Sequence, residues 1–464
     1  MAAGVPRSIG ALRARWRRFQ SASPLRRLGA ATLVAAAGAL GAKGVGFVRE
    51  VLVASAFGLA DGVDVYLVAF VVVGFPLSIL LNAAQPALVT ALAGRPPGED
   101  RADREAVAYG TSIAAIAGIA VVLTPLWLLA VGRALPWIAA GFDPAKREAL
   151  RAALWLLVPY TILSAVNLLC YSVLQARHRF GVVGLMPALT PLAICAAVLA
   201  FRRPDVWPTL CAGLVAGTVL ECVAVNALVL SGLARDGRRP SRAWIAPRAD
   251  VFRRVLTATR QLLPGTLFVA AGPLAEQAIA AGIGSGTNSA LGYGNRLPGS
   301  LAAVVVVAVG ATALPHFSGL IAAARAGYAL HSLRKLTRWL FAAGAIAGLV
   351  LALASTTITR WVFERGAFDP ASTLRVAPVQ AAYFLQLPFA LVQMVALRTL
   401  TAAGRNPAVS RLTAATIVLQ MALAWLLGSR FGATGIAAAA TVATALSALV
   451  ARAVADRALR RQAA

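Results

Sequence analysis

A long apolar run that carries charges decides the fold. Residues 28–58 read LGAATLVAAAGALGAKGVGFVREVLVASAFG. A helix that spans a bilayer needs about 20 apolar residues, so this run predicts one transmembrane helix. It contains Lys43, Arg49 and Glu50, and a charge near the bilayer centre costs at least about 2.5–3.5 kcal/mol on insertion scales. We therefore expect these side chains to face a partner or a wet cavity, where a transported substrate could bind.

Apolar runs of this kind recur along the chain. Of its 464 residues, 59% are hydrophobic and 13% are charged, whereas soluble domains are about 45–50% apolar and about 25% charged. The sequence therefore predicts an all-α polytopic membrane protein. We expect about twelve transmembrane helices, at residues 28–58, 63–93, 107–131, 150–175, 181–201, 207–233, 259–283, 289–322, 336–358, 376–403, 410–428 and 432–456.

The charge of the chain predicts its orientation. The net charge is +27, and the arginines cluster in alternate loops, as the positive-inside rule requires for cytoplasmic segments. We therefore expect a multi-pass protein of the bacterial cytoplasmic (inner) membrane with both termini in the cytoplasm. The basic loops suit the surface of an anionic phospholipid bilayer, so nucleic acid is not an expected partner.

An internal repeat divides the chain into two halves. Phe142-Asp143-Pro144-Ala145 recurs as Phe368-Asp369-Pro370-Ala371 at an offset of 226 residues, and the same offset relates Glu50 to Glu276. An even number of helices per half predicts a parallel repeat, and transporters commonly bind substrate between such halves. In both motifs the Asp before Pro is typical of a helix N-cap. The expected segments are a basic N-terminal segment (1–27), a six-helix lobe (28–234), a basic loop (235–258), a second six-helix lobe (259–456) and a cytoplasmic tail (457–464).

Two arginines are the strongest candidates for substrate binding. Arg49 follows a glycine-rich stretch, 41–46, that permits bending or close packing, and Arg296 lies two residues before a proline. A guanidinium suits phosphate through its bidentate geometry and permanent charge, so we expect an anionic head group. Each arginine has a structural alternative. Arg49 could form an internal ion pair with Glu276 or Asp64, and Arg296 could extend to the membrane interface.

Other charged residues in the expected helices are weaker candidates. The further candidates for substrate binding are Lys43 and Arg398. The candidates for a gate or a counter-charge are Glu50, Asp64, Glu276 and Glu221. Lys43 precedes Glu50 by seven residues and so shares its helical face, whereas Arg398 could reach the interface from the end of its helix. Asp64 could equally cap its own helix, and Glu276 could hold a coupling ion.

No motif for catalysis or metal binding is present. The three histidines and four cysteines have no metal-ligand spacing, and there is no phosphate-binding loop, GxSxG or HExxH. We therefore expect no enzyme, no catalytic residues, no metal and no cofactor. Active transport would then use an ion gradient, such as Na⁺ or H⁺, the membrane potential or coupled metabolism. The sequence does not specify the ion.

Short motifs follow one another along the chain. They are GFVRE at 46–50, AFG at 56–58, DVYLVAF at 64–70, GF at 141–142, YGNRL at 293–297, LP at 314–315 and ERGAF at 364–368. This ordered set resembles the MurJ/MviN family of lipid II flippases, and it covers about residues 28–456. The resemblance implies the fold of the MOP superfamily, with two six-helix lobes around a V-shaped central cavity. It also implies export of undecaprenyl-diphosphate-linked peptidoglycan precursor, lipid II, by alternating access, and a monomer.

The resemblance extends to individual residues. Arg49 and Arg296 match basic cavity positions that the family uses for the diphosphate, and Asp64 matches an acidic position near the gate. Glu50 stands where members often carry Asp. Two departures concern the lipid: the stretch 77–80 lacks the family's usual basic pair, and the chain ends after the twelfth expected helix, where many members add two helices that form a groove for the lipid tail.

Three other functions stay open at this point. A flippase for a lipid-linked O-antigen or exopolysaccharide unit would share the mechanism. An ion-coupled antiporter of drugs or organic cations would need acidic residues, such as Glu276 and Glu221, to dominate the cavity. A membrane scaffold that transports nothing would predict that Arg49 and Arg296 are dispensable.

Overall fold

The computed structural model describes residues 24–79, 85, 101–177, 179–201, 206–237 and 249–463. These residues form helices and short connections, with no β-strand among them. Several expected features lie wholly or partly outside the described residues: most of the N-terminal segment 1–27, most of the second half of the helix expected at 63–93, and the middle of the loop 235–258.

The described helices fall into two sets along the chain. The N-terminal lobe comprises α2 (Pro24–Phe57), α3 (Asp61–Ile79), α5 (Arg101–Ile138), α6 (Pro144–Leu156), α7 (Val158–Ala176), α8 (Phe180–Leu185), the 3₁₀ segment η2 (Met186–Ala188), α9 (Leu189–Ala200) and α10 (Val206–Arg235). The C-terminal lobe comprises α11 (Ala249–Ile283), α12 (Thr287–Ala322), α13 (Ala326–Leu353), α14 (Ser355–Phe363), α15 (Pro370–Ala402) and α16 (Asn406–Ala463).

Nine segments of the described chain are long and apolar enough to cross a bilayer. They are Asp61–Ile79, Ala120–Ile138, Pro144–Ala176, Phe180–Ala200, Val206–Arg235, Thr266–Ile283, Ala326–Leu353, Pro370–Ala402 and Asn406–Gln462. Helices α2 and α12 occupy two further expected positions. Helix α16 covers two expected spans and is interrupted at Gly432, whose φ of 60° is non-helical. The polytopic all-α fold is confirmed, and the count of twelve crossings stays a prediction.

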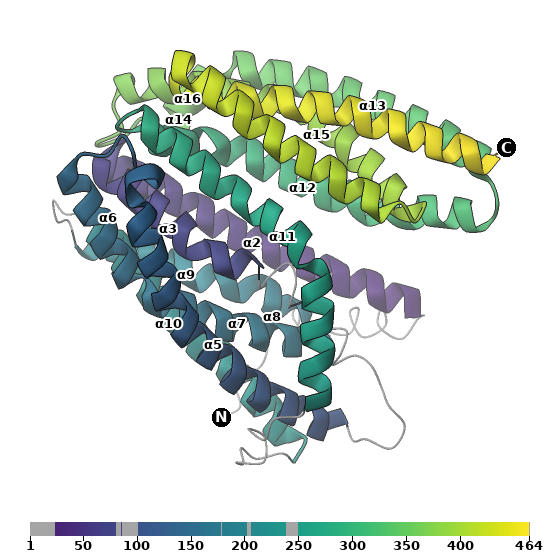
Figure 1. Ribbon diagram of the computed structural model, residues 1–464, viewed down its shortest axis with the longest axis horizontal. Coiled ribbons are helices and arrows are strands. Elements are labelled where there is room, and N and C mark those ends of the chain that lie inside the picture. Colours follow the sequence, from purple (N-terminus) through teal and green to yellow (C-terminus); the bar gives the residue numbers. More distant parts are fainter. Residues whose placement is uncertain are drawn as a thin grey trace, which may run out of the picture.

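The two lobes meet at one end of the molecule and diverge from it. In Figure 1 the helices of the N-terminal lobe slope away from those of the C-terminal lobe, starting from the left-hand side. Helix α15 packs against α12, α13 and α16, while α10 packs against α7 and α9. Helix α11 packs both on α3 and on α16, which ties the lobes together. We call the end where α2 ends and α3, α6, α12 and α15 begin the closed end.

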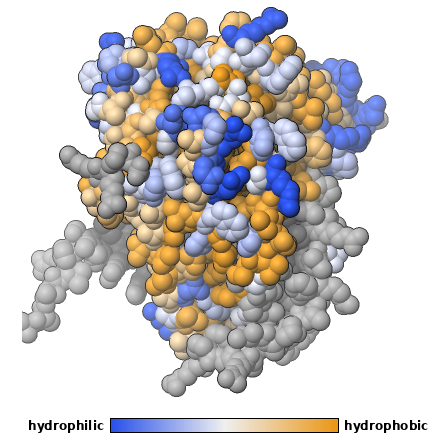
Figure 2. All heavy atoms as spheres, turned by 60° about the vertical axis from the view of Figure 1, so that its left-hand side comes forward, coloured by the Kyte–Doolittle hydropathy of each residue, from blue (hydrophilic) through white to orange (hydrophobic). Residues whose placement is uncertain are grey.

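Large apolar side chains cover much of the molecular surface. Among the most exposed are Leu353, Trp137 and Trp361, at 79%, 77% and 75%. Figure 2, which brings the left-hand side of Figure 1 forward, shows hydrophilic residues gathered on a face that is otherwise largely hydrophobic. Soluble monomers rarely expose apolar patches of this extent. This surface is therefore that of a protein solvated by lipid.

Candidate functional site

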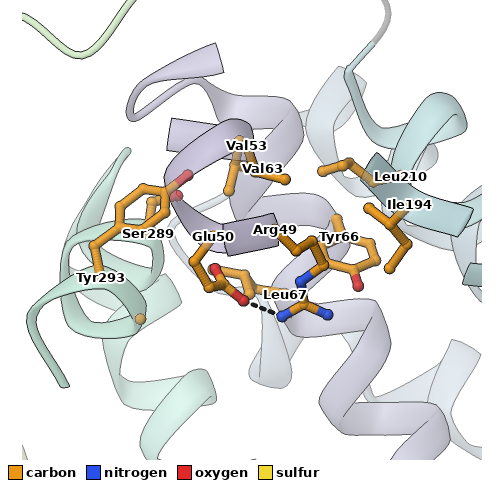
Figure 3. A pocket seen from close by; sticks show the side chains of 11 residues that line it. Arg49, Glu50, Val53, Val63, Tyr66, Leu67, Ile194, Leu210, Ser289 and Tyr293 are labelled. Atoms are coloured by element: carbon orange, nitrogen blue, oxygen red, sulfur yellow. Dashed lines mark hydrogen bonds and ion pairs between the residues drawn. The ribbon is translucent and has the colours of Figure 1, made fainter. Parts of the chain in front are cut away.

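One carboxylate is shared by the two candidate arginines. Glu50, on α2, is 6% exposed and forms ion pairs with its neighbour Arg49 and with Arg296 on α12. Figure 3 shows the Arg49 side chain turned toward Glu50. The alternative of an internal ion pair names the wrong partners, since Arg49 pairs with the adjacent Glu50 and with neither Glu276 nor Asp64. Two guanidiniums against one carboxylate leave a positive charge between the lobes.

Both arginines lie at a similar depth below the closed end. Arg49 precedes Phe57, the last residue of α2, by eight residues, and Arg296 follows Thr287, the first residue of α12, by nine. At 1.5 Å per residue they lie about 12–14 Å into their helices, a depth comparable to half the thickness of a hydrocarbon core of about 30 Å. Side-chain atom Nε of Arg296 is buried and bonds none of the described residues. The site can therefore donate to a further acceptor.

The space around Arg49 is nearly filled in this conformation. A cavity of about 10 Å³ is bordered by Arg49, Glu50, Tyr66 and Tyr293 among others, which is roughly the volume that one water molecule requires. A diphosphate is larger, so it can bind here only after side chains or lobes move apart. The site therefore presents positive charge and hydrogen-bond donors at the interface between the lobes. In this conformation it leaves no room for a diphosphate.

Asp64 connects the lobes at the closed end. It is fully buried and accepts hydrogen bonds from Gly286 N at 2.7 Å, from Ser289 N at 2.9 Å and from Ser289 Oγ at 2.5 Å. Gly286 is the N-cap of α12 and has no side chain to cap it. The Asp64 carboxylate therefore caps α12 from the opposite lobe, where the positive end of the helix dipole favours an anion. Asp64 therefore caps a helix of the other lobe and not its own helix, α3.

Lys146 is a functional candidate that the sequence analysis missed. Its Nζ lies 3.0 Å from Asp64 Oδ2 and 2.5 Å from Asp61 Oδ1, and its side chain is 7% exposed. A lysine in the first turn of a helix opposes the helix dipole, and Lys146 stands in the first turn of α6. A lysine at this unfavourable position was the signal in the sequence that an acidic partner lies nearby. The structure resolves this conflict with the helix dipole, because two carboxylates from α3 neutralise the ammonium group.

The two predicted N-caps are confirmed. Asp143 accepts a hydrogen bond from Lys146 N, and Asp369 accepts one from Ser372 N, each over 2.7 Å. The hydrogen bonds from Ser372 hold the pKa of Asp369 below its usual value. Each capped helix follows a loop whose Phe is buried, Phe142 in one lobe and Phe368 in the other.

These two loops close the lobes against each other through backbone. In the C-terminal lobe, a Cβ on Gly366 would collide with the carbonyl oxygen of Ser55. In the N-terminal lobe, a Cβ on Gly141 would collide with the carbonyl oxygen of Ala281. The offset of 226 residues that relates the loop motifs also relates Ser55 to Ala281. Each lobe therefore packs its loop against the last turn of a helix in the other lobe. These helices are α2 and α11, which the repeat relates.

The remaining candidates are not brought to this interface. Lys43 and Arg398 are exposed and form ion pairs with none of the described residues. Arg398 lies 28 residues into α15, about 42 Å from its start at the closed end. Glu276 accepts hydrogen bonds from Tyr383 Oη at 3.1 Å and from Gln420 Nε2 at 3.2 Å, within the C-terminal lobe. Glu221 is held inside the N-terminal lobe.

Comparison with known proteins identifies relatives of this chain. A family model described as "Lipid II flippase MurJ" matches residues 53–464. A "Probable lipid II flippase MurJ" of Synechocystis sp. is 26% identical over 417 residues, covering 84% of this chain and 74% of the relative. A protein of the same name in Rhizobium tropici is 26% identical over 420 residues, covering 88% and 77%.

Solved structures share the fold. The structure described as "Lipid II flippase MurJ, inward closed conformation" matches with a TM-score of 0.75 at 18% identity, covering 93% of this chain and 90% of that chain. An inward-facing multidrug resistance transporter of the MATE family, in the MOP superfamily, matches with a TM-score of 0.67 at 12% identity, covering 88% and 96%.

Proposed function

This chain belongs to the MurJ family of lipid II flippases, and from that premise we propose that Arg49 and Arg296 bind the diphosphate of its lipid-linked substrate. The family consists of transporters of the bacterial inner membrane rather than enzymes. The observation that carries the proposal is the single carboxylate of Glu50 between two guanidiniums from different lobes. A diphosphate would replace that carboxylate with more negative charge and more acceptor oxygens.

The chemistry of the substrate explains why such a site is needed. The sugars and the diphosphate of undecaprenyl-diphosphate-linked precursor cannot cross hydrocarbon, because their polar groups would have no partners there. Fixed guanidiniums near mid-membrane replace the lost water with charge-assisted hydrogen bonds. The polyprenyl tail is apolar and can stay in the bilayer between the lobes.

Asp64 serves as the gate of the transport cycle. In the present conformation its carboxylate joins α3, α6 and α12 through Lys146, Gly286 and Ser289. Opening the closed end requires all three to part from it, so this network stabilises one of the two states that alternating access needs. We propose that the closed end faces outside, since the basic loops and both termini then face the cytoplasm, as the positive-inside rule favours.

Glu276 is the candidate for ion coupling. It is a carboxyl held by a phenol and an amide, with an ion pair to none of the described residues. A cation or a proton bound there would neutralise it within the C-terminal lobe. We place the division between the lobes in the loop 235–258, with one polypeptide forming the whole transporter in a bilayer that contains anionic phospholipid.

Complementation of a conditional lipid II flippase mutant tests the function. Wild type, Arg49→Ala and Arg398→Ala would be expressed to equal levels in the membrane. We expect growth with wild type and Arg398→Ala but not with Arg49→Ala. Rescue by Arg49→Ala would remove the diphosphate site. Flipping of a fluorescent lipid II by wild type in proteoliposomes, with none by Arg49→Ala, would establish the activity independently of the host.

A further inference from the structure

Glu221 is a buried carboxyl group that the proposed transport mechanism does not use. It lies near the middle of α10 and is 8% exposed. Its Oε1 accepts a hydrogen bond from Tyr171 Oη on α7 at 2.5 Å, and its Oε2 accepts one from Thr190 Oγ1 on α9 at 2.7 Å. Both oxygens are therefore bonded by neutral hydroxyl groups.

The surroundings of Glu221 contain no cation that pairs with it among the described residues. The titratable groups that face it are Tyr171 and Tyr160 on α7 and Cys222 on its own helix. Arg49 on α2 interacts with Tyr160 but forms its ion pair with Glu50. Glu221 thus differs from Glu50 and from Asp64, each of which has a basic partner.

A carboxyl in this position is suited to hold a proton. Burial within a membrane protein disfavours the ionised form when no cation balances it. Hydroxyl groups can donate or accept, so Tyr171 and Thr190 can bond the carboxylate as donors and can accept from the neutral acid when one of them turns. The site therefore accommodates both forms without losing its partners.

Thr190 connects this carboxyl to a broken helix. The helix expected at 181–201 is interrupted by the 3₁₀ segment η2, and Thr190 lies just beyond it, in the first turn of α9. Helix α2, which carries Arg49, packs along α8, η2 and α9. The two segments pack closely at Gly38 on α2, where a Cβ would lie only 3.2 Å from Gly181 O. A shift of the broken helix would therefore act on α2 through this contact.

We propose that Glu221 is a proton-binding site in the N-terminal lobe, and that its protonation state sets the position of α8–η2–α9 against α2. The reaction is the addition of one proton from water to the carboxylate, with no other bond formed or broken. Protonation turns one acceptor oxygen into a donor, so the bond to Thr190 or to Tyr171 must reverse. Proton binding at Glu221 does not depend on the proposed function. Its effect on substrate transport rests on that function.

Infrared difference spectroscopy on the purified full chain in lipid nanodiscs tests the proton site without substrate. Between about pH 5 and about pH 9, a range that spans raised carboxyl titrations, we expect a carboxylic acid carbonyl band that titrates. A component of the band should be lost in Glu221→Gln and kept in Glu276→Gln, which removes the half-buried carboxyl of Glu276 in the other lobe. A spectrum of Glu221→Gln identical to that of wild type would overturn the proposal.

Removing one donor gives a sharper test. Tyr171→Phe takes a hydrogen bond from the ionised form, so the titration midpoint of the band should rise by about one pH unit or more. Tyr160→Phe leaves both hydrogen bonds to Glu221 in place and should move the midpoint less. Equal midpoints in wild type and Tyr171→Phe would contradict the assigned site even if a band is seen.

Transport then tests the coupling. In proteoliposomes, the flipping rate of wild type should vary with pH by up to about tenfold per unit for each proton bound, and this dependence should be weaker in Glu221→Gln than in wild type. Equal pH profiles would refute the coupling. If wild type flips no lipid II, the proposed function fails while the infrared result still decides the proton site.

Discussion

The backbone amide of Ala367 donates a hydrogen bond to the carbonyl oxygen of Ser55 over 2.8 Å. The bond joins the loop between α14 and α15 to the last turn of α2, and so crosses from one lobe to the other. The equivalent residues by the repeat, Gly141 and Ala281, are also in contact. The closed end is therefore formed twice, once by each half of the repeat, and depends on backbones that approach without side chains between them.

Adding a methyl group at this contact should open the closed end. In Gly366→Ala the new Cβ would meet Ser55 O, and the residue has φ of +61°, which disfavours a side chain. The distance between spin labels at Glu148 and Leu374, both exposed, should increase relative to the parent, in a background without the native cysteines.

Gly132→Ala is the matched control for that substitution. Gly132 lies in α5, and no atom lies within 4 Å of the position that a Cβ would take there, so the distance between the labels should not change. If Gly366→Ala also leaves it unchanged, the glycine contact does not hold the lobes together.

Loss of either arginine should abolish transport. Arg49→Ala and Arg296→Ala remove donors at the lobe interface without touching the apolar surface, so both proteins should still insert into the membrane. Arg49→Lys keeps the charge but loses the bidentate fork, and we expect an intermediate rate. Flipping in proteoliposomes measures all three, and wild-type rates in folded Arg49→Ala would exclude it from substrate binding.

Breaking the buried ion pair at the closed end should destabilise the protein. Asp64→Asn leaves the Lys146 ammonium with Asp61 alone, and losing one partner of a buried pair typically costs about 3–5 kcal/mol. Glu148→Gln breaks the exposed pair with Arg151, for which about 1 kcal/mol or less is expected. Thermal unfolding in detergent should therefore show a large decrease in Tm for Asp64→Asn only, and similar decreases in both would argue against a special role for Asp64.

Neutralising Glu276 should remove any dependence of transport on the coupling ion. Glu276→Gln keeps the size of the side chain while removing its charge, and Tyr383 and Gln420 can still bond it. Flipping rates would be compared with and without Na⁺, and with and without a pH gradient. A Glu276→Gln protein that responds to both as wild type does would place the coupling site elsewhere.

The amino-acid sequence by itself determined the features that depend on near neighbours in the chain. Apolar runs predict the all-α membrane fold because hydropathy acts segment by segment. The N-caps at Asp143 and Asp369 follow from an Asp-Pro pair, and the repeat follows from motifs in constant order. Arg49 and Arg296 could be selected because a charge in an apolar helix is costly wherever its partners lie.

Only the tertiary structure decided which charges meet. Glu50 pairs with Arg296 across 246 residues, and Asp64 pairs with Lys146 across 82. The energy of an ion pair depends on distance and burial, which packing between distant helices sets. The sequence left Glu276 and Asp64 open as partners of Arg49, yet Glu276 bonds Tyr383 in its own lobe and Asp64 caps α12. Local propensities specify the helices, whereas the contact between the lobes selects the partners.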